Sequence, residues 1–289
     1  MKQTKYKTVA PAFGGPFSPE CYRQVLEEIY ITYTRPDLIH PDPVEFPRRY
    51  SDKVDREIAA LIASSLAYGR VQQIHRSVER VLSPMEHAPG SFLLSASQDA
   101  LEELYYDFRH RFTSGRELIS FLKGVKRLLI RFGSLEECLA HCIAAQNERN
   151  VFKGITAFAE NLKEAAGGAS SLLASPADGS ACKRFFLFLK WMVRHDSVDP
   201  GGWTVLLPKD ICVPVDTHMH KIGRSLNFTI RKQADLKTVM EITRAFQIIS
   251  PLDPARYDFA LTRFGIRAEL EISDLIKRCS DGVSIHHQG

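Results

Sequence analysis

The sequence predicts an all-α protein. Apolar residues recur every three or four positions along most of its 289 residues, as they do on one face of an amphipathic helix. Strand-like alternation of apolar and polar residues is confined to the short run 211–215. With 44% hydrophobic residues, the chain can bury a substantial core in one large domain or in two lobes. A helical globular protein is therefore expected.

Breaks marked by proline and glycine divide the first half of the chain into helices. Residues 18–33 form the first predicted helix, and four prolines between residues 34 and 49 predict an extended connector. Ser51 is expected to open a long helix, because Asp52 and Asp55 follow it and acidic side chains favour the first turn. Further helices are predicted at 71–82, 98–112, 114–132, 134–145 and 151–166, with a loop around Pro84 and Pro89.

The second half begins with a segment rich in glycine and serine, residues 167–180, which predicts a loop or hairpin. A helix is expected at 181–194, capped by Ser180 or Asp178. Asp216 is expected to cap the next helix, and late helices are predicted at 235–249 and 254–264. The predicted domains are an N-terminal helix and connector (1–50) packing on the C-terminal lobe, a helical-barrel lobe with the hairpin (51–210), a C-terminal helical lobe (211–280) and a disordered tail (281–289).

Composition limits the protein's environment. The six cysteines, together with the polar and basic start of the chain, favour a reducing compartment, and we expect a cytoplasmic monomer. No apolar run reaches the ~20 residues of a membrane span, so no membrane partner is expected. Cys138 and Cys142 lie one helical turn apart and are interpreted as core thiols. No metal or other cofactor is predicted.

The positive charge of the chain is concentrated in one segment. Net charge is only +4, but residues 179–232 contain nine lysines and arginines against four aspartates, a local excess of +5. Such clusters usually decorate a solvated helix face, and they also form phosphate-binding surfaces. The segment is therefore a candidate for contact with nucleic acid.

Lys183 and Asp216 are the two candidate catalytic residues. A lysine in the first turn of a helix meets the positive end of the helix dipole, which favours the neutral, nucleophilic amine. An aspartate at a helix cap is held ionised by backbone N–H groups and can stabilise a developing positive charge. Taken singly, Lys183 also fits an exposed helix position, and Asp216 also fits an ordinary cap.

These residues resemble the helix-hairpin-helix DNA glycosylase superfamily (HhH-GPD). The run P-V-D-T-H at 214–218 is similar to the superfamily's aspartate motif, and residues 57–74 and 257–265 resemble its first and last core helices. The helix at 183–192 is similar to the lysine helix of archaeal 8-oxoguanine DNA glycosylases, and the interval of 33 residues from Lys183 to Asp216 is comparable with theirs. The whole chain also resembles an uncharacterised bacterial HhH-GPD-like family. The resemblance implies two helical lobes with a substrate cleft between them.

The resemblance implies a DNA repair N-glycosylase that removes a damaged base, with or without AP lyase activity. The similarity to the archaeal enzymes favours an oxidised purine as that base. Lys183 would attack the sugar and Asp216 would stabilise the transition state. The hairpin departs from the usual L-P-G-x-G pattern, because Lys183 lies four residues after Gly179, and Lys190 is therefore the fallback nucleophile. The four-cysteine set of an iron–sulfur cluster is absent.

Further contacts with duplex DNA are expected from the hairpin and from neighbouring helices. The candidates for DNA binding are Arg70, Asp178, Gly179, Ser180, Arg184 and Arg224. The candidates for the base pocket are Tyr68, Phe186, Trp191 and His218, although the aromatic residues also fit a helix core.

Two other functions remain open at this point. Asp216, His218 and His220 would form the metal site of a hydrolase if they lay on a strand, whereas on a helix residues two apart diverge by about 200°. A helix-hairpin-helix protein that binds DNA without catalysis would need neither Lys183 nor Asp216.

Overall fold

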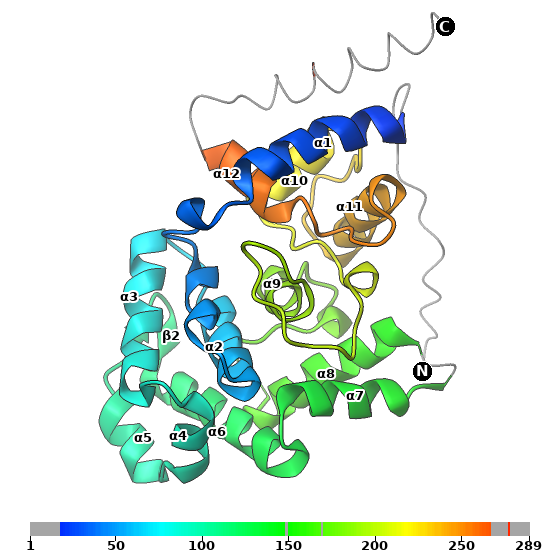
Figure 1. The fold of residues 1–289 in the computed structure, drawn as a ribbon. Coiled ribbons are helices and arrows are strands. Elements are labelled where there is room, and N and C mark those ends of the chain that lie inside the picture. The colour runs from blue at the N-terminus through cyan, green and yellow to red at the C-terminus, as the bar shows by residue number, and fades with distance from the viewer. Residues whose placement is uncertain (1–17, 148–149, 169, 267–276, 278–289) are drawn as a thin grey trace, which may run out of the picture.

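Helix α9 (Lys183–Val193) runs through the middle of the molecule, and the other helices surround it (Figure 1). Phe185 and every residue from there to Val193 are buried, because apolar side chains cover most of the circumference of the helix. Helix α9 packs against α2 (Lys53–Ser65). This computed structural model describes residues 18–147, 150–168, 170–266 and 277.

The remaining helices lie in two groups on either side of α9 (Figure 1). One group accompanies α2 and comprises α3 (Val71–Leu82), α4 (Pro89–Ser95), α5 (Gln98–Tyr105), α6 (Gly115–Phe132), α7 (Leu135–Ala144) and α8 (Val151–Ala165). The other comprises α1 (Pro19–Tyr33), α10 (Thr217–Ser225), α11 (Leu236–Ile249) and α12 (Asp258–Ile266). Helix α1 packs against α11 and α12, so the first described helix lies beside the last ones.

The described residues are mostly helical, which confirms the all-α prediction. Their one sheet is the antiparallel pair β1 (Arg109–His110) and β2 (Thr113–Ser114). Within these residues we find no helix that combines the length and the apolar character needed to cross a bilayer. The expected tail at 281–289 lies outside the described residues.

Several element boundaries differ from the predictions. The connector is not extended but forms three 3-10 turns, η1 (Pro36–Leu38), η2 (Pro43–Glu45) and η3 (Pro47–Arg49), each with a proline in its first position. Proline breaks α-helices but suits the start of a tight turn. The loop expected near Pro89 is helix α4, which begins at that proline. The run 211–215 is not a strand, and the helix expected at 98–112 ends at Tyr105.

Two predicted caps were also wrong. Asp52, and not Ser51, caps α2, and its side chain accepts hydrogen bonds from the N–H groups of Val54 and Asp55. At the start of α9 the cap position is Cys182, which has φ +46° and makes no side-chain cap hydrogen bond. The chain therefore turns sharply at Cys182 and places Lys183 at the first position of the helix.

Glu57 on α2 joins three parts of the core. Its side chain is fully buried and accepts hydrogen bonds from the N–H groups of Leu135 (2.5 Å) and Glu136 (3.3 Å), so it caps α7 from another helix. The indole N–H of Trp203 donates the third bond, at 2.9 Å. Burial outweighs these donors and raises the pKa of Glu57 to about 7.

We expect Glu57 to make the stability of the protein depend on pH. In the unfolded chain this carboxyl ionises near 4.5, whereas in the folded protein it holds its proton up to about 7. The stabilisation that comes from protonated Glu57 is therefore complete below pH 4.5. The free energy of unfolding should fall by about 3 kcal/mol as pH rises from there through 7. Urea unfolding of the wild type and Glu57→Gln across this range measures the difference. Glu137→Gln, at an exposed position of α7, is the control. Equal pH dependence in wild type and Glu57→Gln would contradict the expectation.

Candidate active site

A cavity of about 90 Å³ opens beside α9 where the two groups of helices meet. Lys183, Leu187, Lys190 and Trp191 reach it from successive turns of α9, and Asp216 reaches it from the cap of α10. Its remaining walls come from the connector, α3 and α12, including Asp42, Pro43, Ile74, Asp258, Phe259 and Thr262. The cavity thus brings together two side chains that lie 33 residues apart in the sequence.

Asp216 occupies the predicted cap position. Its Oδ1 accepts a hydrogen bond from the N–H of Met219 at 2.8 Å, and Met219 is buried beneath it. This bond fixes the carboxylate at the cavity wall. Asp258 is close enough to feel its charge: burial above all, and then the Asp216 carboxylate, raise the pKa of Asp258. The cavity is accordingly lined by two carboxyl groups and two lysines.

The two lysines differ in their partners. Lys190 is buried, and its Nζ forms ion pairs with Asp199 (3.1 Å) and Asp258 (3.2 Å). Burial lowers the pKa of Lys190, but the two carboxylates outweigh burial and raise it above its ordinary value. Lys183 is only half-buried, and among the described residues it forms no ion pair. Lys190 is therefore held as a charged ammonium group, which is not a nucleophile, and the structure corrects the choice of Lys190 as fallback.

The residues predicted for the base pocket are not gathered in one place. Trp191 lines the cavity, but Phe186 packs in the core beside Phe185 and is absent from the cavity wall. Tyr68 also lies outside the wall, where its hydroxyl contacts the Thr113 hydroxyl at 2.5 Å and donates to the His110 carbonyl at 3.1 Å. His218 is exposed on the first turn of α10. Of the four, only Trp191 reaches the cavity.

The hairpin does not offer the expected phosphate site. The N–H of Asp178 donates to the Ser175 carbonyl and that of Gly179 to the Pro176 carbonyl, both at 3.0 Å. The Asp178 side chain is paired with Lys163 at 2.7 Å. Ser180 is exposed and forms an isolated bridge with Asp235. Because the two amide groups are used inside the turn, the prediction that they hold phosphate oxygens is corrected.

Arg184 is also used within the protein. Its guanidinium donates to the backbone carbonyls of Ser65 and Ser171 and lies 4.8 Å from the centre of the Tyr68 ring. This arrangement joins α9 to the end of α2 and to the loop that precedes α9. Arg184 therefore stabilises the fold, and its assignment to DNA contact is corrected.

Arg70 and Arg224 lie in two basic grooves on the surface. The α3 groove contains the exposed side chains of Arg70, Arg76, Arg80 and Arg109, together with Gln72 and Gln73. The α10 groove is lined by Thr217, His220, Lys221, Arg224, Ser225 and Lys232. The helices that carry the grooves also contribute to the cavity, because Ile74 of α3 lines it and α10 begins at Asp216.

The alternative metal site does not assemble. His218 and His220 lie on helix α10, so their side chains diverge, and Nε2 of His220 is 2.9 Å from the Arg231 carbonyl oxygen. Among the described residues, the side chains that gather as metal ligands are three others, His40, Glu45 and His75. Cys138 and Cys142 are buried beside each other, as core thiols would be.

Sequence reasoning missed Asp199 and Asp258, the partners of Lys190, and the arginines at positions 76 and 109. The two aspartates follow no periodic pattern in the sequence. The one sequence feature that could have indicated them was Lys190 itself, because a lysine buried in an apolar helix needs a carboxylate partner. The two arginines lie outside the basic segment 179–232 and were not named as candidates.

A family model described as "Protein of unknown function (DUF2400)" matches residues 42–267. The matched region contains every residue that lines the cavity and both basic grooves. The comparison with curated proteins found no match, and neither did the comparison with solved structures.

Proposed function

The chain belongs to the DUF2400 family, and we propose that it is a DNA repair N-glycosylase that forms a Schiff base through Lys183. The observation that carries this proposal is the shared cavity of Lys183 and Asp216. An amine and a carboxylate directed into one cavity suit substitution at a sugar carbon, where the amine attacks and the carboxylate stabilises positive charge. The resemblance of the surrounding motifs to HhH-GPD glycosylases supports the same chemistry.

The reaction begins when the Lys183 amine attacks C1′ of the damaged nucleotide. The new C–N bond forms as the N-glycosidic bond breaks, and the base leaves with that electron pair and takes up a proton. Asp216 stabilises the positive charge that develops on the sugar and accepts a proton from the attacking amine. Opening of the sugar ring then gives the Schiff base between Lys183 and C1′, from which β-elimination of the 3′ phosphate can follow.

Entry of the nucleotide requires the cavity to widen. At about 90 Å³ the cavity holds a few water molecules, whereas sites for small organic ligands measure about 300 Å³ or more. A base turned out of the duplex would therefore have to displace wall residues such as Phe259 and Thr262. Selection of the damaged base would take place during this opening.

The two basic grooves support DNA as the substrate. Arginines 70, 76 and 109 are exposed along the α3 groove, where they can contact phosphates. The turn between β1 and β2 adds Phe112, which is 69% exposed and stacks on Tyr68 with the ring centres 5.2 Å apart. An exposed aromatic ring among arginines is typical of surfaces that stack on or wedge between bases.

Removing two groove arginines should weaken DNA binding in a salt-dependent way. Each phosphate contact contributes about one unit to the slope of log K against log salt, so Arg76→Gln with Arg109→Gln should lower that slope by about 2. Fluorescence anisotropy of a labelled duplex between low and physiological salt measures the slope. Arg244→Gln removes an exposed charge from α11, outside both grooves, and should leave the slope unchanged. An equal loss in the control would argue against a specific DNA surface.

Borohydride trapping tests the proposed function. Reduction of the Schiff base should join the wild type covalently to a duplex that carries an abasic site or a suitable damaged base, with oxidised purines tested first. Lys183→Gln should form no adduct, whereas Lys237→Gln, which removes an exposed lysine from α11 outside both grooves, should react normally. Mass spectrometry of the digested adduct should place the DNA on Lys183.

Three outcomes would overturn the proposal. An adduct on another lysine would show that Lys183 is not the nucleophile. An adduct formed by Lys183→Gln would show the same. If every lesion and abasic site fails to react although salt-dependent binding is normal, the protein is a DNA-binding protein without this activity.

A further inference from the structure

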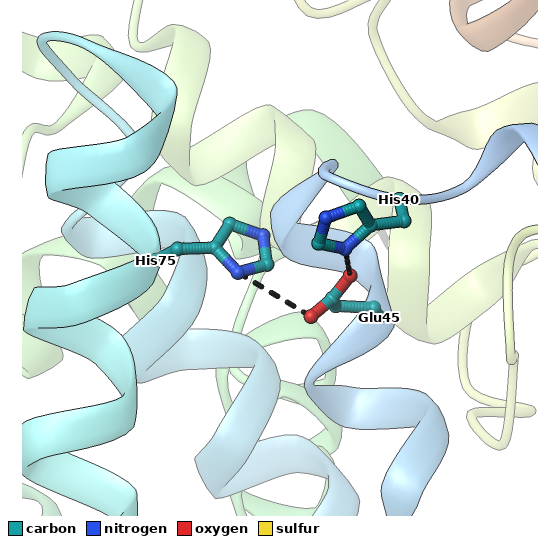
Figure 2. A group of neighbouring side chains, drawn as sticks. All are labelled: His40, Glu45 and His75. Atoms are coloured by element: carbon teal, nitrogen blue, oxygen red, sulfur yellow. Dashed lines mark hydrogen bonds and ion pairs between the residues drawn. The ribbon is translucent and has the colours of Figure 1, made fainter.

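Three metal-binding side chains meet where the connector runs along α3. Figure 2 shows the Glu45 carboxylate beside the imidazole rings of His40 and His75, each of which directs a nitrogen at it. Nδ1 of His40 lies 3.0 Å from one carboxylate oxygen, and Nδ1 of His75 lies 3.4 Å from the other. We infer that His40, Glu45 and His75 bind a divalent metal ion of the zinc type.

The spacing of the three side chains suits one metal ion. Their potential ligand atoms all lie within 4.8 Å of one another. Ligands about 2.0–2.1 Å from a tetrahedral zinc ion are about 3.4 Å apart, so the widest separation must close by only about 1.4 Å. The side chain of His40 is 78% exposed and can make this adjustment, while Glu45 and His75 are 20% and 17% exposed and held in place.

Hydrogen bonding alone leaves His75 poorly satisfied. The 3.4 Å contact from its Nδ1 to Glu45 is longer than a good hydrogen bond. Its Nε2 is buried and has no hydrogen-bond partner within the described part of the chain. Burying an imidazole nitrogen without a hydrogen-bond partner is unfavourable, because the nitrogen loses its hydration and gains no bond in return. Coordination by either nitrogen would replace a weak or missing interaction with a strong one.

Arg49 is the competing cation, because its guanidinium lies 3.4 Å from Glu45. It has two other partners, Glu79 at 2.8 Å and the Phe46 ring, whose centre is 4.4 Å away. Arg49 can therefore release Glu45 to a metal ion and keep its position.

The composition of the group indicates which metal and what kind of site. Two imidazoles and one carboxylate suit zinc and its neighbours among the transition metals, and not Mg²⁺ or Ca²⁺, which prefer oxygen ligands. Three protein ligands leave a coordination position open. Because His40 is exposed, that position faces solvent, and water or an anionic oxygen such as that of a phosphate can fill it.

The proposed metal site adjoins the cavity. Asp42 and Pro43, from the same segment as His40 and Glu45, line the cavity, and so does Ile74, the neighbour of His75. A metal ion would fasten the connector to α3 and fix this wall. The site uses neither Lys183 nor Asp216, so it does not depend on the proposed glycosylase activity.

Metal titration of the full-length protein tests the inference. After removal of bound metal with a chelator, Zn²⁺ is titrated against a coloured competitor. The wild type should bind one equivalent, and its melting temperature should rise with zinc. His75→Ala and Glu45→Gln should each weaken binding by more than the ~10–100-fold that is typical of losing an outer-shell partner. His218→Ala is the matched control and should bind as the wild type does.

The histidines at 286 and 287, which lie outside the described residues, need their own control. A variant with both changed to alanine should keep the equivalent of zinc. Failure of the wild type to bind Zn²⁺ or Co²⁺ at micromolar concentration would overturn the inference, as would full binding by a folded Glu45→Gln protein. Loss of the equivalent in His218→Ala, or in the 286/287 variant, would place the metal elsewhere. Circular dichroism tests whether each variant is folded. If His75→Ala is unfolded, the zinc binding of Glu45→Gln decides the result.

Discussion

Lys190→Met is expected to lower the free energy of unfolding by about 3–5 kcal/mol, because it leaves two buried carboxyl groups without their ammonium partner. Asp199 and Asp258 both lose an ion pair of about 3 Å. Arg194 still contacts Asp199, but Asp258 has no other ion pair among the described residues. Methionine fills a similar volume, so the loss should come from charge and not from a cavity.

Urea unfolding at neutral pH measures this loss, and pH identifies its cause. At acid pH the unpaired carboxyl groups of Lys190→Met become protonated. The difference in free energy of unfolding between Lys190→Met and the wild type should therefore shrink as pH falls. Lys183→Met makes the same change two turns earlier on α9, where the side chain is half-buried and forms no ion pair among the described residues, and it should cost at most about 0.5 kcal/mol. A loss below about 1 kcal/mol in Lys190→Met would show that the network contributes little.

The position of this network explains why the place of Lys183 in its helix was predicted and the partners of Lys190 were not. The helix dipole acts on the first turn of α9, and the structure does place Lys183 at its first position. Lys190 owes its properties to Asp199 and Asp258, one in a turn and one on another helix. Such contacts depend on tertiary packing, which leaves no periodic signal in the sequence. Periodicity therefore predicted the helices better than the partners of their charged side chains.

The same limit applies to the connector and to the hairpin. Prolines correctly excluded a long helix between residues 34 and 49, but they did not reveal the 3-10 turns that bring His40 and Glu45 to His75. In the hairpin, the sequence showed glycine, serine and aspartate but not which carbonyls accept from their N–H groups. Asp216 was predicted correctly as a cap, because an N-cap depends on residues within one turn of it.

Asp216→Asn is expected to slow base removal by about 10²–10⁴-fold while leaving stability almost unchanged. Asparagine caps helices as well as aspartate does, so its side-chain oxygen should keep the bond to the N–H of Met219. The negative charge is lost, and with it the stabilisation of positive charge on the sugar. Single-turnover base release and thermal unfolding of the same preparations measure the two properties separately.

Asp216→Ala is the matched variant, because it removes both the charge and the cap. It should lose activity to a similar extent and, in addition, about 1 kcal/mol of stability. If Asp216→Asn releases the base at the wild-type rate, the carboxylate serves only as a cap and the cavity has a different chemistry. If both variants lose stability equally, the introduced asparagine has failed to keep the cap bond, and the loss of activity would then reflect displacement of α10. The two variants together therefore distinguish the chemical role of the charge from the structural role of the cap.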